Sequence, residues 1–139
     1  MTEPFRTTRR VEFVDTDMAG IVHFSNFFRW MESAEAELLR ARGVTFKLRW
    51  EGQELGFPRV SAACDYRKPA RFQDLLTIQV LVEKIGRKSV SYRFEFSNQA
   101  GDPLATGRIT AVYCRTNSPD QIEALDIPDD IRAKLQGAM

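Results

Sequence analysis

The chain has 139 residues, which is enough for one domain with a hydrophobic core and too few for two domains of ordinary size. Its net charge is only +1 at pH 7, which argues against a nucleic-acid-binding protein, because such proteins usually carry a strong basic excess. No apolar run approaches the roughly 18 residues of a membrane span, and the start of the chain lacks the apolar core of a signal peptide, so we expect a cytoplasmic protein with no membrane span.

The reactive side chains are few. Cys64 and Cys114 lie far apart without C-x-x-C spacing, so we expect two buried free thiols and neither a disulfide framework nor a metal site. His23 is the only histidine, which excludes any mechanism that needs two histidines within one subunit.

The first predicted element is a strand over residues 5–14, with Val11 and Phe13 on one face. A loop over 15–24 follows. It is rich in residues that can do chemistry or form a tight turn: Asp15, Asp17, Gly20 and His23.

The main predicted helix spans residues 25–42. Ser25 and Asn26 are residue types that often cap the start of a helix, and Gly43 is a natural stop. Apolar residues recur at helical spacing over several turns, which predicts a helix buried along one face: Phe27, Met31, Ala34 and Leu38.

Residues 44–57 predict a short helix or irregular cover. Alternation of apolar and polar residues then predicts four strands, over 59–66, 76–83, 90–96 and 105–113, and a short helix ends near Gln136. Small residues on the last strand, among them Gly107, would let a helix lie close against the sheet. We therefore predict an α+β fold: a single domain over residues 1–139, with one antiparallel five-stranded sheet and one central helix. A single helix covers one face, so the other face and the edges are expected to meet another subunit.

The loop before the main helix predicts a reactive site. A helix N-terminus carries unpaired N–H groups and partial positive charge, so it can stabilise an oxyanion. Asp17 beside it could attack a carbonyl or activate water, or it could be a turn aspartate that bonds to its own backbone. Asp15 could raise the pKa of its neighbour by repulsion, or it could cap the loop.

The run from Asp15 to Glu32 reads DTDMAGIVHFSNFFRWME. It resembles the signature of hot-dog-fold acyl-CoA thioesterases of the 4-hydroxybenzoyl-CoA thioesterase type, D-x-D-x-x-G-[IV]-V followed by a short polar turn and a helix. The resemblance extends over nearly the whole chain. It implies a hot-dog fold, in which the sheet wraps around the long central helix. It also implies hydrolysis of an acyl-CoA to a free acid and CoA, no cofactor apart from the CoA of the substrate, and a homodimer or homotetramer.

The resemblance also implies roles for residues of the loop. Asp17 falls on the catalytic carboxylate, as a nucleophile that forms a mixed anhydride or as a general base for water. The backbone N–H of Phe24 would polarise the thioester carbonyl, and Gly20 and Ile21 would approach the substrate. His23 departs from the family register, so it either contributes to the site or is a polar loop residue.

Basic residues suggest where CoA would bind. The turn that contains Arg87, Lys88 and Ser89 aligns with a turn that contacts CoA phosphates in the family, and we expect it to act across a subunit interface. The alternative is a solvated hairpin tip. A second basic cluster, Arg67, Lys68 and Arg71, is either an ordinary charged loop or a further contact for the nucleotide.

Two further polar residues are candidates on weaker grounds. Ser61 would line the pocket from the second predicted strand of the sheet. Glu32 is considered because another branch of hot-dog thioesterases takes its carboxylate from the central helix; otherwise it is a solvated or interface acid.

Two other functions stay open: an acyl-carrier-protein thioesterase, and a non-catalytic acyl-CoA-binding module of the same fold. A Ser-His-Asp hydrolase is disfavoured, because the chain has no G-x-S-x-G motif.

Overall fold

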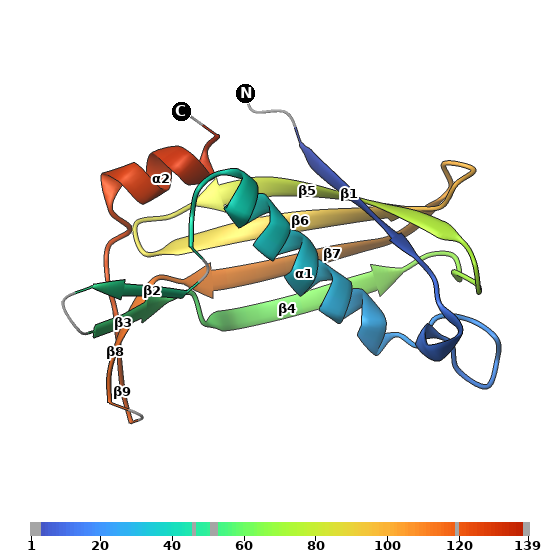
Figure 1. Ribbon diagram of the computed structural model, residues 1–139, viewed down its shortest axis with the longest axis horizontal. Helices are drawn as coiled ribbons and strands as arrows, with labels where there is room; N and C mark the ends of the chain where they lie inside the picture. The colour runs from blue at the N-terminus through green and yellow to red at the C-terminus, as the bar shows by residue number, and fades with distance from the viewer. Residues whose placement is uncertain (1–3, 46, 51–52, 119, 138–139) are drawn as a thin grey trace.

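The computed structural model describes residues 4–45, 47–50, 53–118 and 120–137. The main sheet has five antiparallel strands in the order β1-β5-β6-β7-β4. Their bounds are Phe5–Arg10 (β1), Arg59–Tyr66 (β4), Leu75–Ile85 (β5), Ser89–Ser97 (β6) and Pro103–Val112 (β7). One long helix, α1 (Ser25–Ala41), runs diagonally across one face of this sheet (Figure 1). The predicted α+β architecture is confirmed.

A second, four-stranded sheet lies at one end of the molecule, in the order β2-β3-β8-β9. Its strands are Lys47–Trp50 (β2), Gln53–Gly56 (β3), Cys114–Ser118 (β8) and Gln121–Ala124 (β9). The prediction of a short helix or irregular cover over 44–57 is therefore wrong. The reason is tertiary: β3 pairs with β8 through Gly56 and Cys114, which are 58 residues apart in the chain.

The first strand is also shorter than predicted. It ends at Arg10, and a short 3-10 helix, η1 (Phe13–Asp15), replaces its second half. Val11 is buried but Phe13 is 78% exposed, so the two do not share a buried face. The Asp15 carboxylate accepts the N–H of Glu12 at 2.8 Å, which turns the chain out of the sheet. Asp15 therefore caps this turn, one of its two predicted roles.

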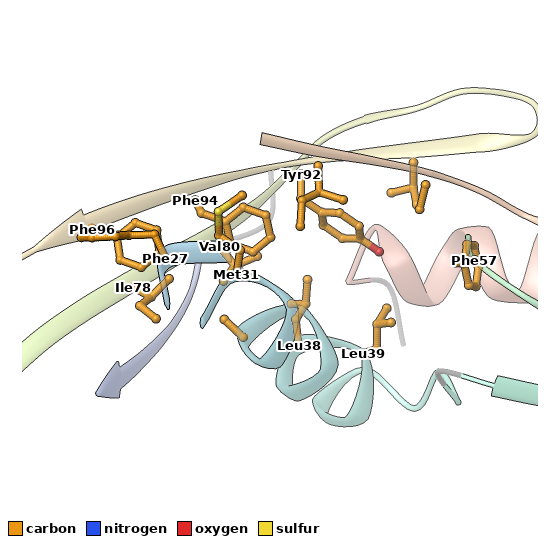
Figure 2. Close-up of a cluster of buried hydrophobic side chains, with 14 of the residues drawn as sticks. Phe27, Met31, Leu38, Leu39, Phe57, Ile78, Val80, Tyr92, Phe94 and Phe96 are labelled. Atoms are coloured by element: carbon orange, nitrogen blue, oxygen red, sulfur yellow. The ribbon is translucent and has the colours of Figure 1, made fainter. Parts of the chain in front are cut away.

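The core lies between α1 and the sheet (Figure 2). The four residues predicted for the buried face of α1 are all buried. Phe27 packs edge-to-face on Phe96 of β6, with ring centroids 5.0 Å apart. Burial of side chains of this size stabilises the fold by about 1.5–3 kcal/mol each. The short helix α2 (Asp129–Leu135) covers the far end of the sheet with Ile131 and Leu135.

Gly107 of β7 sets how closely α1 approaches the sheet. A Cβ at this position would lie 2.6 Å from both Cε and Sδ of Met31, which is fully buried. Because Gly107 has no side chain, the end of the Met31 side chain, in the middle of α1, packs against β7 at this position. The small residues of β7 predicted such an approach. Gly43 adopts a φ of +75° at the end of α1, as expected of a glycine stop.

Glu35 is the unexpected residue of the core. It belongs to α1, its side chain is fully buried, and it forms an ion pair with Arg59 at the start of β4. Burial raises the pKa of Glu35 to about 7, although the Arg59 guanidinium acts in the opposite direction. The pair ties the centre of the helix to the edge of the sheet.

We predict that Gly107→Ala destabilises the fold by about 1–3 kcal/mol, because the new methyl group overpacks Met31. Urea unfolding measures the loss. Gly56→Ala is the matched control, because a Cβ there meets nothing within 4 Å. Equal stability of the two variants would contradict the close approach.

We predict that Glu35→Gln flattens the pH dependence of stability. A raised carboxyl pKa means that the folded protein holds this proton more tightly than the unfolded chain does, so stability falls as pH rises from 4.5 to about 7. A shift of this size corresponds to about 3 kcal/mol across that window. Urea unfolding between pH 4.5 and 8 measures the slope. Glu37→Gln, on the same helix but in a partly exposed pair with Arg9, should keep the wild-type slope.

Candidate active site

The loop before α1 is built around a tight turn from Asp17 to Gly20. The N–H of Gly20 donates to the carbonyl of Asp17 at 3.0 Å, and the N–H of Asp17 donates to the carbonyl of Ile21 at 2.8 Å. Gly20 has a φ of +78°, which side-chain-bearing residues rarely adopt. Apart from its two chain neighbours, no described residue has an atom within 4 Å of where its Cβ would be. The positive φ, and not a lack of space, is therefore the reason that this position requires glycine.

The rest of the loop is held by hydrogen bonds on two sides, to the segment after β4 and to the first turn of α1. The N–H of Val22 donates to the carbonyl of Ala70 at 2.8 Å. The carbonyl of Asp15 accepts the N–H of His23 at 2.9 Å and the side-chain amide of Asn26 at 2.8 Å. The position of the loop relative to the helix is therefore fixed from both sides.

The Asp17 carboxylate is exposed and half engaged. Its Oδ1 accepts the N–H of Ala19 at 2.8 Å, the local backbone bond expected of a turn aspartate. Its Oδ2 forms no hydrogen bond or ion pair within the described part of the chain. The turn and the chemistry are thus compatible, because one oxygen orients the carboxylate and the other stays available.

The helix start differs from the prediction. Residue 24 occupies the N-cap position with helical angles, and no side chain of the usual capping type bonds to the first turn. Ser25 and Asn26 are not caps. Instead, Nδ1 of His23 accepts the N–H of Ser25 at 3.3 Å and lies 2.7 Å from its hydroxyl. His23 therefore bonds to the first residue of the helix, and its ring stacks on that of Phe24 with centroids 4.7 Å apart. A contribution of His23 to the site stays a prediction.

The N–H of Phe24 is the donor of interest. Among the described residues, neither a backbone nor a side-chain acceptor bonds to it. The carbonyl of the same residue accepts the Tyr66 hydroxyl at 3.1 Å. An unpaired N–H at a helix N-terminus, where the partial charge is positive, is suited to a carbonyl oxygen that gains negative charge.

These groups border one cavity of about 360 Å³. Its walls come from the loop, the first turn of α1 and the segment after β4, and they are largely apolar and aromatic. Asp17 lines it, as do Ile21, Val22, Phe24, Phe27, Tyr66, Arg67, Lys68, Pro69 and Ala70. The cavity thus brings Asp17 and Phe24, the residues with the free carboxylate oxygen and the unpaired N–H, together with apolar walls and two cations.

The cations beside Asp17 belong to the second basic cluster. Arg67 donates to the Thr106 hydroxyl at 2.6 Å, and Lys68 pairs with Asp102 at 2.6 Å. Of the two basic groups predicted from the sequence, this cluster is the one that lies near Asp17 within a protomer. Arg71 joins it through the β-bridge to Ile21.

The turn with Arg87, Lys88 and Ser89 lies at the opposite end of the sheet (Figure 1). Its N–H at Gly86 donates to the carbonyl of Ser89 at 2.7 Å, and Arg87 pairs with Asp126 at 3.1 Å. The 11 residues of β5 separate this turn from the Asp17 end, a distance of roughly 35 Å. One protomer therefore does not bring the turn and Asp17 together.

Two other predicted residues lie outside the cavity. Ser61 pairs with Thr110, whose neighbour Ile109 is buried toward the helix, so the register places Ser61 on the outer face of the sheet. Glu32 borders a different cavity of about 320 Å³, next to Arg59 and β3.

Sequence reasoning missed Tyr66 as a site residue. The signal in the sequence that could have identified it is its position at the end of the alternating strand over residues 59–66, directly before the basic cluster.

The described residues contain no group of three or more potential metal ligands from His, Cys, Asp and Glu. None of their helices is long and apolar enough to cross a membrane. Both cysteines are free; Cys114 is buried, as expected, whereas Cys64 is only partly buried.

The chain is similar to known thioesterases over most of its length. Residues 11–135 match the family model of the thioesterase-like superfamily. The 1,4-dihydroxy-2-naphthoyl-CoA hydrolase of Nostoc punctiforme is 29% identical over 127 residues, which cover 91% of this chain and 83% of that protein. The 4-hydroxybenzoyl-CoA thioesterase of Pseudomonas sp. strain CBS-3 is 28% identical over 138 residues, or 94% of this chain and 96% of that one.

Solved structures agree on the fold. A solved structure of the same Pseudomonas thioesterase superimposes with a TM-score of 0.81 at 26% identity, covering 96% of this chain and 99% of that chain. The hot-dog fold predicted from the loop signature is therefore confirmed, as is the enzyme family. The chain belongs to the thioesterase-like superfamily and is a hot-dog thioesterase.

Proposed function

We propose that the chain hydrolyses an aryl-CoA thioester to the free acid and CoA, with Asp17 and the N–H of Phe24 as the reacting groups. The observation that carries the proposal is their position on one cavity, each with a free atom: Oδ2 of Asp17 and the unpaired N–H of Phe24. Relatives that act on 1,4-dihydroxy-2-naphthoyl-CoA and 4-hydroxybenzoyl-CoA support this substrate class.

The reaction follows from these positions. The thioester oxygen accepts the Phe24 N–H, and the helix N-terminus stabilises the negative charge that develops there. In one route, Asp17 attacks the carbonyl carbon, CoA leaves as the thiolate, and water then hydrolyses the mixed anhydride. In the other, Asp17 takes a proton from water as the water attacks. Both routes consume one water and release the acid and CoA.

The shape of the cavity favours an aromatic acyl group. Phe24, Phe27 and Tyr66 present aromatic surface, and Phe27 packs edge-to-face on Tyr66 at 5.2 Å. A planar ring is stabilised by such contacts, whereas a long flexible chain loses more conformational entropy on binding.

We also propose that the working form contains a dimer formed along β4. This strand is one of the two edges of the main sheet, and most of its residues are exposed, whereas half of those of the other edge strand, β1, are exposed. Antiparallel pairing with a second copy places the start of the partner's β4 beside the end of this one. The Arg87–Ser89 turn lies at the same end of the sheet as the start of β4, because Ser89 and Arg59 both pair near the end of β7. Arg87 of the partner subunit thereby approaches this Asp17.

The two alternatives predict different behaviour. An acyl-carrier-protein thioesterase would release little thiol from free CoA esters but act on the carrier-bound ester. A non-catalytic module would bind acyl-CoA without turnover. A cytoplasmic location stays a prediction.

We predict that Asp17→Asn lowers kcat for aryl-CoA by at least about a hundredfold, because the amide can neither attack nor accept the proton. Thiol release from a panel of benzoyl-, 4-hydroxybenzoyl-, 1,4-dihydroxy-2-naphthoyl- and short aliphatic CoA esters measures it. Asp130→Asn on the exposed surface of α2 is the matched control and should retain wild-type rates. Equal turnover by Asp17→Asn and wild type would remove Asp17 from the mechanism.

We predict that inactive variants complement each other if the site is shared. Asp17→Asn alone and Arg87→Glu/Lys88→Glu alone should both be poorly active at low substrate. Mixed dimers of the two contain one site with both defects and one site with neither, so activity should return toward half the wild-type value. Assays after co-refolding, with light scattering to establish the oligomer, measure this. Absence of recovery in a confirmed mixed dimer would show that Arg87 and Asp17 of different subunits do not serve one site.

A further inference from the structure

The peptide groups on either side of Phe24 are held unequally. Its N–H is unpaired in the described part of the chain. Its carbonyl begins the hydrogen-bond ladder of the helix and also accepts the N–H of Phe27 at 3.3 Å and the hydroxyl of Tyr66 at 3.1 Å. The Phe27 bond is long for an N–H donor. The peptide that precedes Phe24 is held by the N–H of Asn26, which donates to the carbonyl of His23 at 3.0 Å, and the Tyr66 bond links the peptide that follows to the end of β4.

The neighbouring polar side chains are engaged elsewhere. The helix lacks a side-chain cap, the Ser25 hydroxyl is engaged with His23, and Asn26 donates to the carbonyl of Asp15. Phe24 is thus the residue at which the loop ends and the helix begins. Among the described side chains, Tyr66 is the one that bonds to its backbone.

Tyr66 itself is rigidly placed. It ends β4, where it pairs with Ala105 of β7, and its ring packs edge-to-face on the buried Phe27 at 5.2 Å. The ring is 45% exposed and lines the cavity that holds Asp17. The hydroxyl can therefore act as a fixed point that connects the edge of the sheet to the helix start.

We propose that Tyr66 is a positioning residue for thioester hydrolysis. Its hydroxyl holds the carbonyl of Phe24 and thereby orients this residue so that the Phe24 N–H meets the thioester oxygen. This inference rests on the proposed function. It assigns Tyr66 no contact with the reacting atoms and no proton transfer.

The chemistry of the phenol suits this role. Partial burial raises the pKa of Tyr66 to about 12, with the neighbouring Cys64 thiol acting in the same direction. The hydroxyl hence stays protonated and remains a donor through the neutral and mildly alkaline range. Loss of the hydroxyl should lower the rate without changing the shape of the pH profile below pH 10.

The kinetic test is Tyr66→Phe, which removes the hydroxyl and keeps the ring on Phe27. We expect kcat to fall by about tenfold to a hundredfold for the aryl-CoA with the highest kcat/KM, because misplacement of a donor by a fraction of an ångström carries a penalty of this order. KM should stay within about twofold, because the ground-state contacts of the ring and of CoA remain. Tyr113→Phe, away from the cavity, is the matched control and should keep wild-type kcat.

A spectroscopic test measures the positioning without turnover. In the Asp17→Asn background, the thioester C=O stretch of the same bound aryl-CoA, labelled with carbon-13 at the carbonyl, should shift to lower frequency than in water because the Phe24 N–H polarises it. In the Asp17→Asn/Tyr66→Phe double variant we expect a smaller shift or two bands, from a misplaced donor.

The outcomes separate the two proposals. Wild-type kcat and an unchanged carbonyl band in the Tyr66→Phe variants, with Asp17→Asn still inactive, would overturn the role of Tyr66 and leave the proposed function standing. Full activity of Asp17→Asn, or no turnover of any CoA ester by wild type, would overturn the proposed function and the inference with it. A rise in KM with unchanged kcat would also overturn the positioning role, because it would indicate a substrate contact.

Discussion

The packing of α1 on the main sheet, with the end of the Met31 side chain against Gly107, is the interaction on which the geometry of the site depends. Because Gly107 has no side chain, the end of Met31 fits against β7, and the first turn of α1 meets Tyr66 at the end of β4. A helix held further out would lift Phe24 away from Tyr66 and Phe27 away from Phe96. The packing that stabilises the core thus also fixes where the free N–H at the helix start points.

The parts of the site that were predictable are those specified by local sequence. The turn at Asp17 and Gly20 needs only a carboxylate that bonds two residues ahead and a glycine at positive φ, and both are visible in the sequence. The buried face of α1 follows from helical spacing alone. The N-cap prediction was wrong for the opposite reason. Ser25 and Asn26 have the right chemistry, but contacts formed only in the folded chain, to His23 and Asp15, engage them instead.

The features that were not predicted depend on contacts between residues far apart in the sequence. The hairpin over 47–56 is specified by β8, which lies beyond the whole main sheet in sequence. Glu35 lies at helical spacing from Met31 and Leu38, on the buried stripe of α1, but its partner Arg59 comes from β4 and is not visible in the local sequence. The presence of Tyr66 at the helix start depends on the register of β4 against β7, which alternation of residue types alone does not fix.

The edge strand β4 has a consequence for the unpaired protomer. Its charged residues lie at or near its ends, Arg59 and Asp65, while its middle reads Val-Ser-Ala-Ala-Cys, with no lysine or proline to deter pairing. Proteins usually protect a bare strand edge with such residues, since open backbone N–H and C=O groups are a template for another extended chain. A newly made protomer therefore carries an aggregation-prone segment until something covers it. In the proposed dimer this edge is covered, so slow or dilute assembly would leave it open for longer and lower the yield of folded protein.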